Sequence, residues 1–365
     1  VLAFVLIFLI LAGYPYLMRL IQGPPPEAPV TAAADSTAVV ADLDEPARVP
    51  VESDQAASAP DETGFQEIPV EADTNPTNAT EALAFVSGAS GETVHVRTPL
   101  YQIDIDTRGG RIIRWLGLEF GHHEGGNVQL VPGEYPERGS DRVLFRGGDL
   151  DLGAAPYQAD QPRLELRSGS GPATLTLTAE TAGGLEVRKI FTFRPDVYGI
   201  EVDMVVAAPT EAARSALNLT GSPETFRFGW NQGIVPTERV ERMEVPNMRA
   251  VAKIGEDLHT KKRQDLNKSV DKVTGQWTGS AHYAGVQSRY FTAMGIVPQE
   301  EGTPIEGTIR LSGDEETLAQ SWAIDLPADR GVGDEIAVAR LDYFIGPQDA
   351  ELLQAYGRGL EKSMD

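Results

Sequence analysis

Cysteine is absent from this chain of 365 residues, which excludes disulfide bridges and thiolate metal sites. Basic side chains are scarce: 31 Lys and Arg residues stand against 54 Asp and Glu residues, for a formal net charge of -23. Because phosphate binding needs clustered positive charge, we expect no nucleic-acid partner. The same imbalance disfavours close contact with an anionic membrane surface.

Catalytic signatures are absent as well. The sequence has no G-x-S-x-G, no H-E-x-x-H, no P-loop and no dinucleotide fingerprint. Paired carboxylates are abundant, but in a chain of this charge no pair can be singled out as an acid–base couple. We therefore predict no catalytic, cofactor-binding or metal-binding residues and no cofactor, and we expect a protein that is not an enzyme.

The five histidines are scattered along the chain, at His95, His122, His123, His259 and His282. His122, His123 and Glu124 could be imagined as metal ligands. Successive residues of a strand point to opposite faces, however, so this pair of histidines is not expected to share an ion. His282 adjoins Tyr283 in an aromatic-rich region, and we expect it to be a packed core or interface residue.

The first stretch of the chain, Val1 to Met18, is uncharged and mostly apolar, and the first charged side chain is Arg19. A run of this length reaches the lower end of what spans a bilayer as a helix. We predict one transmembrane anchor helix at 1–22, in contact with the lipid bilayer. A cleaved secretory signal is the alternative, although no convincing small-residue cleavage site directly follows the apolar run.

The interval 23–92 has a different composition, with fourteen acidic residues against the single base Arg48, and with nine prolines. Such a segment cannot bury enough apolar surface to offset the entropy of ordering, so we predict a disordered linker. A solvated spacer is the interpretation that we favour. The alternative is an acidic docking segment for a basic partner.

From residue 93 to 346 the pattern becomes that of strands. Tyr101, Ile103 and Ile105 alternate with polar residues, and Gly109-Gly110 then supplies a tight turn. The same alternation with glycine turns recurs several times, and helical periodicity is almost lacking. These features predict a mainly β domain, a large antiparallel β-sandwich.

Two stretches depart from the strand pattern. The interval from Glu238 to Val273 is polar and contains the basic run 261–263 (Lys-Lys-Arg), and we expect a solvated irregular loop there. Residues 347–365 show helical spacing, which predicts an amphipathic C-terminal helix packed on the sheet edge. Asp349 is its expected N-cap, with Leu352 and Leu353 in the first turns.

Several short motifs, taken in order, resemble those of the periplasmic part of the YidC family of bacterial membrane protein insertases, in the Oxa/Alb group. The quoted segments are Thr107-Arg108-Gly109-Gly110-Arg111-Ile112, Phe191-Thr192-Phe193-Arg194, Asp196-Val197-Tyr198, Ile200-Glu201-Val202, Gln276-Trp277, Arg289-Tyr290-Phe291, Ile296-Val297-Pro298, Tyr343-Phe344-Ile345-Gly346-Pro347 and Leu352-Leu353.

This resemblance implies a β-supersandwich similar to galactose mutarotase, closed by a short helical region near the carboxyl end. It also implies an inner-membrane protein with a cytoplasmic amino terminus and its large domain in the periplasm. The implied role is to assist insertion and folding of inner-membrane proteins, with nascent chains and the Sec translocon as partners. The insertase core of further membrane helices would follow Asp365, so no insertase site residue can be assigned in this chain.

Two other functions are open at this point. The chain could be a membrane-tethered periplasmic adaptor that binds extended peptides by adding them to a sheet edge. It could also be a mutarotase-like protein that binds or converts sugars, which would require a histidine and a carboxylate that converge in one pocket. A fold alone does not establish that activity.

Overall fold

The computed structural model describes residues 76–86, 91–132, 140–146, 149–218, 223–262, 273–299, 303–313 and 320–364. All of them lie within one compact unit, Val70–Asp365. In this part of the chain no helix is both long enough and apolar enough to span a bilayer. The predicted anchor at 1–22 and most of the predicted linker lie outside the described residues.

The end of the interval predicted as a disordered linker carries ordered structure instead. Helix α2 (Pro76–Leu83) is followed by a segment that joins the large sheet. Leu83 is buried, and Val86 N donates to Glu180 O at 2.9 Å. The acidic composition of the interval conceals this short docking segment, because only a few apolar residues make the contact.

The smaller of two sheets has the strand order β4-β3-β2-β1-β8, and its pairs are antiparallel except β1 with β8. The predicted turn at Gly109-Gly110 joins β2 to β3, and both glycines have positive φ angles, +83° and +59°. The strands of this sheet are β1 (Thr93–Arg97), β2 (Tyr101–Asp106), β3 (Arg111–Gly121), β4 (Asn127–Gln129) and β8 (Arg163–Glu165).

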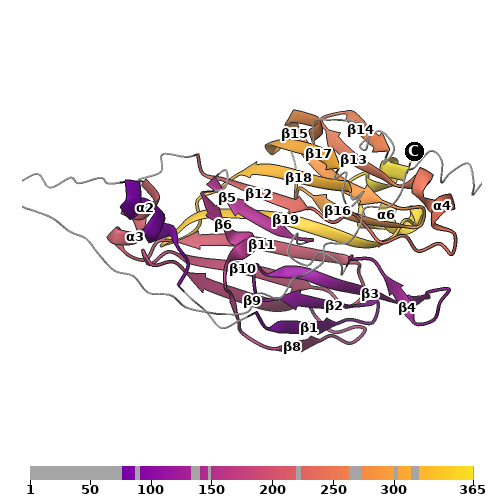
Figure 1. Ribbon diagram of the computed structural model, residues 1–365, viewed down its shortest axis with the longest axis horizontal. Helices are drawn as coiled ribbons and strands as arrows, with labels where there is room; N and C mark the ends of the chain where they lie inside the picture. The colour runs from indigo at the N-terminus through magenta and orange to yellow at the C-terminus, as the bar shows by residue number, and fades with distance from the viewer. Residues whose placement is uncertain are drawn as a thin grey trace, which may run out of the picture. The chain divides into compact units, whose positions relative to one another are not determined.

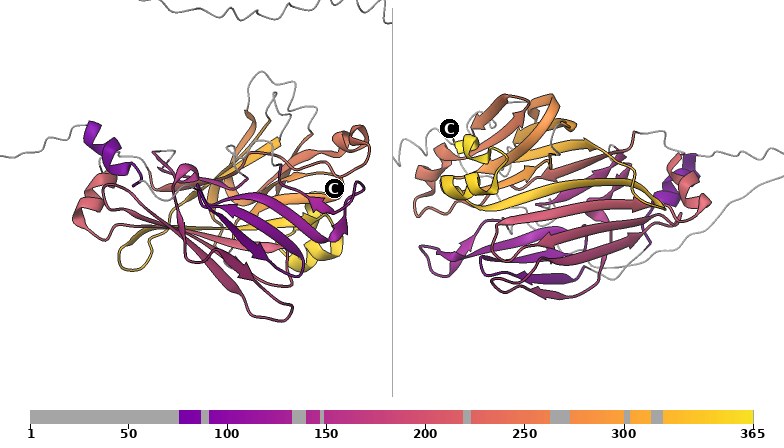
Figure 2. Two further views of the ribbon diagram at one scale, coloured as in Figure 1. Left: turned by 60° about the horizontal axis from the view of Figure 1, so that its bottom comes forward. Right: turned by 180° about the vertical axis from the view of Figure 1, so that it is seen from behind.

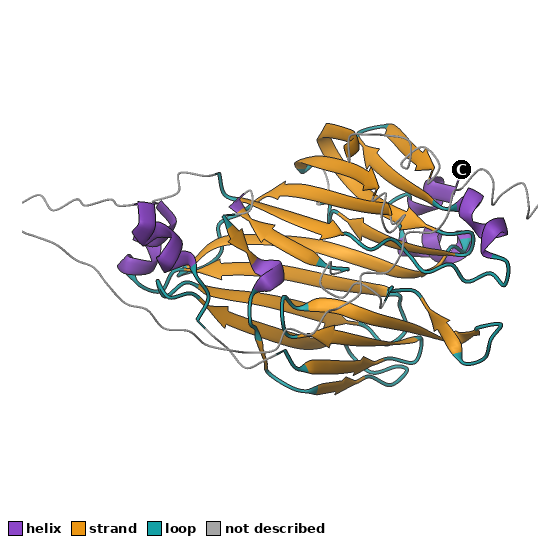
Figure 3. Cartoon of the chain, viewed as in Figure 1, coloured by secondary structure: helices purple, strands orange, loops and turns teal. Residues whose placement is uncertain are grey.

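The large sheet has 14 strands, with the main order β6-β5-β12-β18-β17-β15-β16-β19-β11-β10-β9-β7 and a branch in which β13 pairs with β14 and β15. Its strands are β5 (Arg142–Phe145), β6 (Leu150–Asp151), β7 (Gln158–Ala159), β9 (Ala173–Glu180), β10 (Glu186–Phe193), β11 (Gly199–Ala207), β12 (Thr225–Trp230), β13 (Arg249–Ile254), β14 (Asp257–Lys262), β15 (Val273–Gln287), β16 (Phe291–Ile296), β17 (Glu306–Gly313), β18 (Gln320–Pro327) and β19 (Glu335–Pro347). The prediction of a mainly β, antiparallel two-sheet domain is confirmed (Figures 1 and 3).

One predicted loop is wrong. The interval from Glu238 to Val273 contains the hairpin β13–β14, in which Ala252 pairs with His259. Its turn is made by Gly255, with φ +52°. Lys261 and Lys262 therefore belong to a strand, while Arg263 lies outside the described residues. Ala250, Val251 and Ala252 are buried together, and so short an apolar run among polar residues gives no clear period of two.

Aromatic rings of the smaller sheet pack against a ring of the large sheet in the shared core, and Figure 2 shows the ribbons of the two sheets from two further sides. Tyr101 stacks on Trp115 with ring centroids 5.9 Å apart, and Tyr198, which precedes β11, lies 6.3 Å from Tyr101. Elsewhere in the core Trp322 lies 5.9 Å from Tyr343. These buried rings contribute apolar area removed from water, the main favourable contribution to folding.

A buried ion pair links β10 to the residue before β5, both in the large sheet, and its lysine also reaches the smaller sheet. Lys189 Nζ lies 2.7 Å from Asp141 Oδ2, and both side chains are completely buried. Lys189 also donates to the carbonyl oxygen of Gly110 at 2.9 Å, and Tyr343 Oη donates to Asp141 Oδ1 at 2.5 Å. Burial lowers the pKa of Lys189, while the adjacent Asp141 carboxylate opposes that shift. One lysine of β10 thus holds the β2–β3 turn of the smaller sheet against the large sheet.

The carboxyl end contains two short helices rather than one. Asp349 caps α6 (Ala350–Tyr356) as predicted, because its side chain accepts from Leu352 N at 2.9 Å. The helix ends at Gly357, φ +86°, and η5 (Leu360–Met364) follows. Helix α6 packs on a sheet face and not on an edge, because its Tyr356 ring lies 5.5 Å from Phe344 of β19, an interior strand of the sheet.

Candidate interaction surface

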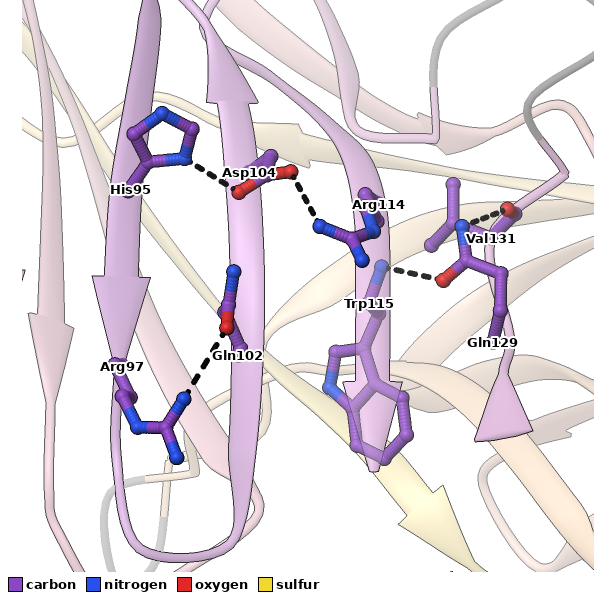
Figure 4. Close-up of polar contacts among 8 residues, drawn as sticks. All are labelled: His95, Arg97, Gln102, Asp104, Arg114, Trp115, Gln129 and Val131. Carbon is purple, nitrogen blue, oxygen red and sulfur yellow. Dashed lines mark hydrogen bonds and ion pairs between the residues drawn. The ribbon is translucent and has the colours of Figure 1, made fainter. Parts of the chain in front are cut away.

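The outer face of the smaller sheet carries a row of charged side chains. His95 Nδ1 lies 2.7 Å from Asp104 Oδ1, and Arg114 Nη1 donates to Asp104 Oδ2 at 3.2 Å. Figure 4 shows these residues side by side on β1, β2 and β3. In the same view, Gln129 accepts from Trp115 N and donates to the carbonyl oxygen of Val131.

This row brings together the histidine and the carboxylate that a sugar-converting enzyme would need. The strand alternation, however, places His95 on the side of β1 opposite the buried Val94 and Val96. The two oxygens of Asp104 are engaged by His95 and Arg114, one each. This arrangement is typical of a polar sheet face and not of a histidine and a carboxylate that converge in a pocket.

The structure brings His122, His123 and Glu124 together. Each offers one ligand atom, and these atoms all lie within 4.8 Å of one another. The alternation of a strand does not separate these side chains, because β3 ends at Gly121 and the three residues lie in the turn before β4.

The other two histidines lie on β14 and β15. His282, on β15, is partly buried as expected, and burial lowers its pKa, with a smaller contribution from the charge of Lys253. The ring of His259, on β14, stacks on Trp277 with centroids 4.1 Å apart and an interplanar angle of 12°. Both histidines therefore have packing roles.

A loop lies at one end of the domain, between β12 and β13. It is held by Glu244, the last residue of α4 (Glu241–Glu244), whose side chain is fully buried. One carboxylate oxygen of Glu244 accepts from Thr237 N at 2.6 Å and from Glu238 N at 2.8 Å. Charge-assisted bonds of this kind are about twice as strong as neutral ones, so the loop is pre-organised.

Large apolar side chains are exposed at this same end, where α4 and α6 lie in both Figure 1 and the right-hand view of Figure 2. Met243 is 60% exposed, Tyr290 46%, Val240 44% and Leu352 42%. Arg289 stacks on the ring of Tyr290 at 5.2 Å and pairs with Glu238 at 3.3 Å. We call the four exposed residues Val240, Met243, Tyr290 and Leu352 the α4–α6 surface.

Hydrogen bonds connect the segments that carry this surface. Gln348 N donates to Tyr290 O at 2.6 Å, and the Gln348 side chain donates to the carbonyl oxygens of Ser288 and Phe291. The β15–β16 turn is therefore fixed to the start of α6. These four exposed apolar side chains, on segments linked by hydrogen bonds, make this end of the domain a candidate interaction site.

The Asp342 carboxylate lies on the sheet face next to α6, in surroundings that disfavour its charged form. Asp342 pairs across the strands with Glu201, and its Oδ1 is buried without a hydrogen-bond partner among the described residues. Burial, followed by the negative charge of Glu201, raises the pKa of Asp342 to about 6, from the usual 3.8. Ionised Asp342 is thus destabilising in the folded state.

We expect Asp342→Asn to stabilise the domain at pH 8 by about 1–2 kcal/mol and to have little effect at pH 4. Between pH 4 and pH 6 the folded state holds a proton that the unfolded state has released, so wild-type stability falls as pH rises through that window. Urea unfolding of both proteins at several pH values measures the difference. A difference that does not change with pH would contradict the assignment.

The family model and the similar known proteins name the same family. The family model described as the YidC periplasmic domain matches residues 93–365. A membrane protein insertase YidC from Syntrophus aciditrophicus is 24% identical over 93% of this chain and 57% of its own length. Another from Nitratidesulfovibrio vulgaris is 26% identical over 100% of this chain and 59% of its own length. The chain thus spans somewhat more than half the length of these relatives.

Solved structures with a similar arrangement include a galactose mutarotase related enzyme from Lactobacillus acidophilus. It is 9% identical, covers 69% of this chain and 97% of its own, and has a TM-score of 0.43. A galactose mutarotase-like protein from Lactobacillus casei is also 9% identical, over 70% of this chain and 99% of its own, with a TM-score of 0.42.

Proposed function

The chain belongs to the family of YidC periplasmic domains, and from this premise we propose that it is the amino-terminal and periplasmic part of a membrane protein insertase. In this role it assists insertion and folding of inner-membrane proteins, alone or with the Sec translocon. The observation that supports the proposal most strongly is the family match over residues 93–365, nearly the whole of the described domain.

The same proposal covers the organisation of the chain. Residues 1–22 cross the inner membrane from a cytoplasmic amino terminus, residues 23–92 are mainly a spacer, and residues 93–346 form a β-supersandwich in the periplasm. Residues 347–365 lead toward the insertase core, which we assign to the part of the relatives that this chain does not cover. The chain itself is not an enzyme in this proposal, and its row of His95, Asp104 and Arg114 is structural.

We assign contact with nascent membrane proteins to the α4–α6 surface. A nascent segment is apolar, and Met243, Tyr290 and Leu352 offer apolar area that is already exposed before binding. The loop carrying Met243 is held by Glu244, so little ordering entropy is lost on binding. The net charge of -23 disfavours contact between this surface and an anionic bilayer. The same repulsion does not apply to an apolar nascent segment.

A binding titration tests this assignment. A fluorescent peptide with the sequence of an apolar membrane segment is titrated against the fragment from Val70 onward, which is one compact unit. Met243→Asp should weaken binding about tenfold, since the lost burial of one large apolar side chain is about 1.5 kcal/mol or more. Val332→Asp is the matched control, because Val332 is 87% exposed but lies in the β18–β19 turn. Equal weakening by both variants would contradict the assignment.

A second candidate function, the peptide-binding adaptor, has one observation in its favour. Among the described strands β14 pairs with β13 alone, so its other edge is open to strand addition. The same titration with an extended polar peptide separates the two functions. Strand addition depends on main-chain hydrogen bonds, so a polar peptide would then bind as well as the apolar one, and Met243→Asp would have no effect.

A further inference from the structure

The turn between β3 and β4 concentrates metal-ligating side chains, at His122, His123 and Glu124. Gly121 pairs with Asn127 at the base of the turn, and His122 N donates to Gly126 O at 2.9 Å. Gly125 and Gly126 have φ angles of +104° and +76°, which a residue with a side chain rarely adopts. The two glycines and these pairings define the backbone conformation of the turn.

We propose that this turn binds a divalent transition-metal ion through His122, His123 and Glu124. The rings of the two histidines lie side by side, with centroids 4.2 Å apart. His123 Nε2 lies 3.9 Å from Glu124 Oε1, and the three ligand atoms all fall within 4.8 Å of one another.

These distances are close to those of a formed site. Zinc binds imidazole nitrogen and carboxylate oxygen at about 2.0–2.2 Å, which places tetrahedral ligands about 3.3–3.5 Å apart. The Glu124 side chain is 78% exposed, so its rotation can bring the carboxylate nearer to the two imidazoles. His122 Nδ1 now accepts from Glu124 N at the long distance of 3.3 Å, a weak contact that a metal ion can replace.

The donor set specifies the class of ion. Two imidazoles and one carboxylate suit zinc, copper or nickel, whereas calcium and magnesium prefer sites made of oxygen ligands. Three ligands from one turn leave at least one coordination position open to water or to a donor from another molecule. The strongly acidic chain also raises the local concentration of cations.

Zinc titration by isothermal calorimetry tests the site, on the full chain in detergent and without a polyhistidine tag. We expect saturable binding of one zinc ion per chain. His122→Ala and His123→Ala should each weaken it tenfold or more, because each removes one of three ligands. His95→Ala is the control, since His95 is also partly exposed but pairs with Asp104 on β2. That variant should bind zinc as the wild type does.

Several results would overturn the proposal. These are the absence of saturable zinc binding, unchanged zinc binding in both His122→Ala and His123→Ala, an equal loss in His95→Ala, and calcium binding as tight as zinc binding. Circular dichroism of each variant verifies that the fold is intact, and the exposed position of the turn makes unfolding by these substitutions unexpected.

Discussion

Replacing Lys189 with methionine is expected to lower the free energy of unfolding by about 3–5 kcal/mol, because it leaves the Asp141 carboxylate buried without its counter-charge. Lys189 and Asp141 are both fully buried at 2.7 Å, and the lysine also holds the carbonyl oxygen of Gly110. A loss of this size is a large share of the stability of a typical domain. Urea unfolding of the fragment from Val70 onward measures it.

Two controls make the result specific to the buried pair. Lys262→Met removes an exposed lysine from edge strand β14 and should leave unfolding unchanged. The double variant Lys189→Met with Asp141→Leu removes both charges, and it should be less destabilised than the sum of its two single variants. If Lys189→Met unfolded at the same urea concentration as Lys262→Met, the buried ion pair would not stabilise the domain as we describe.

Replacing Glu244 with alanine should cost about 2–4 kcal/mol, because it leaves the partly buried amides of Thr237 and Glu238 without an acceptor. The loss is local, so the segment between β12 and β13 should exchange its amide hydrogens faster while the core strands stay protected. Apolar peptide binding should weaken with it, since the loop no longer presents Met243 in a fixed position. Hydrogen exchange and the fluorescence titration measure the two effects.

Glu244→Gln separates the charge of this residue from its hydrogen bonds. The amide keeps one acceptor oxygen, so the expected loss is smaller, about 1 kcal/mol. Glu256→Ala is the matched control, because the Glu256 side chain is fully exposed and should not affect either measurement. Slow exchange in the 237–244 loop of Glu244→Ala would show that other contacts hold the loop.

The strands were predictable because alternation is a local property. Tyr101, Ile103 and Ile105 are all completely buried, as their period of two requires. The same alternation in β10 places Lys189 on the buried face between Val187 and Phe191, so its position could have been read from the sequence. Its partner could not, since Asp141 lies 48 residues away. The pairing of distant strands decides that contact.

The candidate sites were less predictable for the same reason. Glu244 accepts from amides six and seven residues earlier, a spacing that belongs to no helix or strand period. The strand pattern of the sequence predicts that His122 and His123 point to opposite faces. Because β3 ends at Gly121, they lie in a turn instead, where their rings are neighbours. Tyr290 stands in a motif that resembles the family, yet its 46% exposure depends on distant contacts such as the one from Gln348 N to its carbonyl oxygen.

Site-specific photo-crosslinking in native membranes tests the central claim most directly. A photoreactive amino acid is placed at Met243 of the α4–α6 surface and, in a second protein, at Val332, and ribosome-bound nascent chains of an inner-membrane protein are then generated. The proposal predicts crosslinks from position 243 to the apolar segment of the nascent chain and none from position 332. Equal crosslinking from both positions, or crosslinks from position 332 alone, would contradict it.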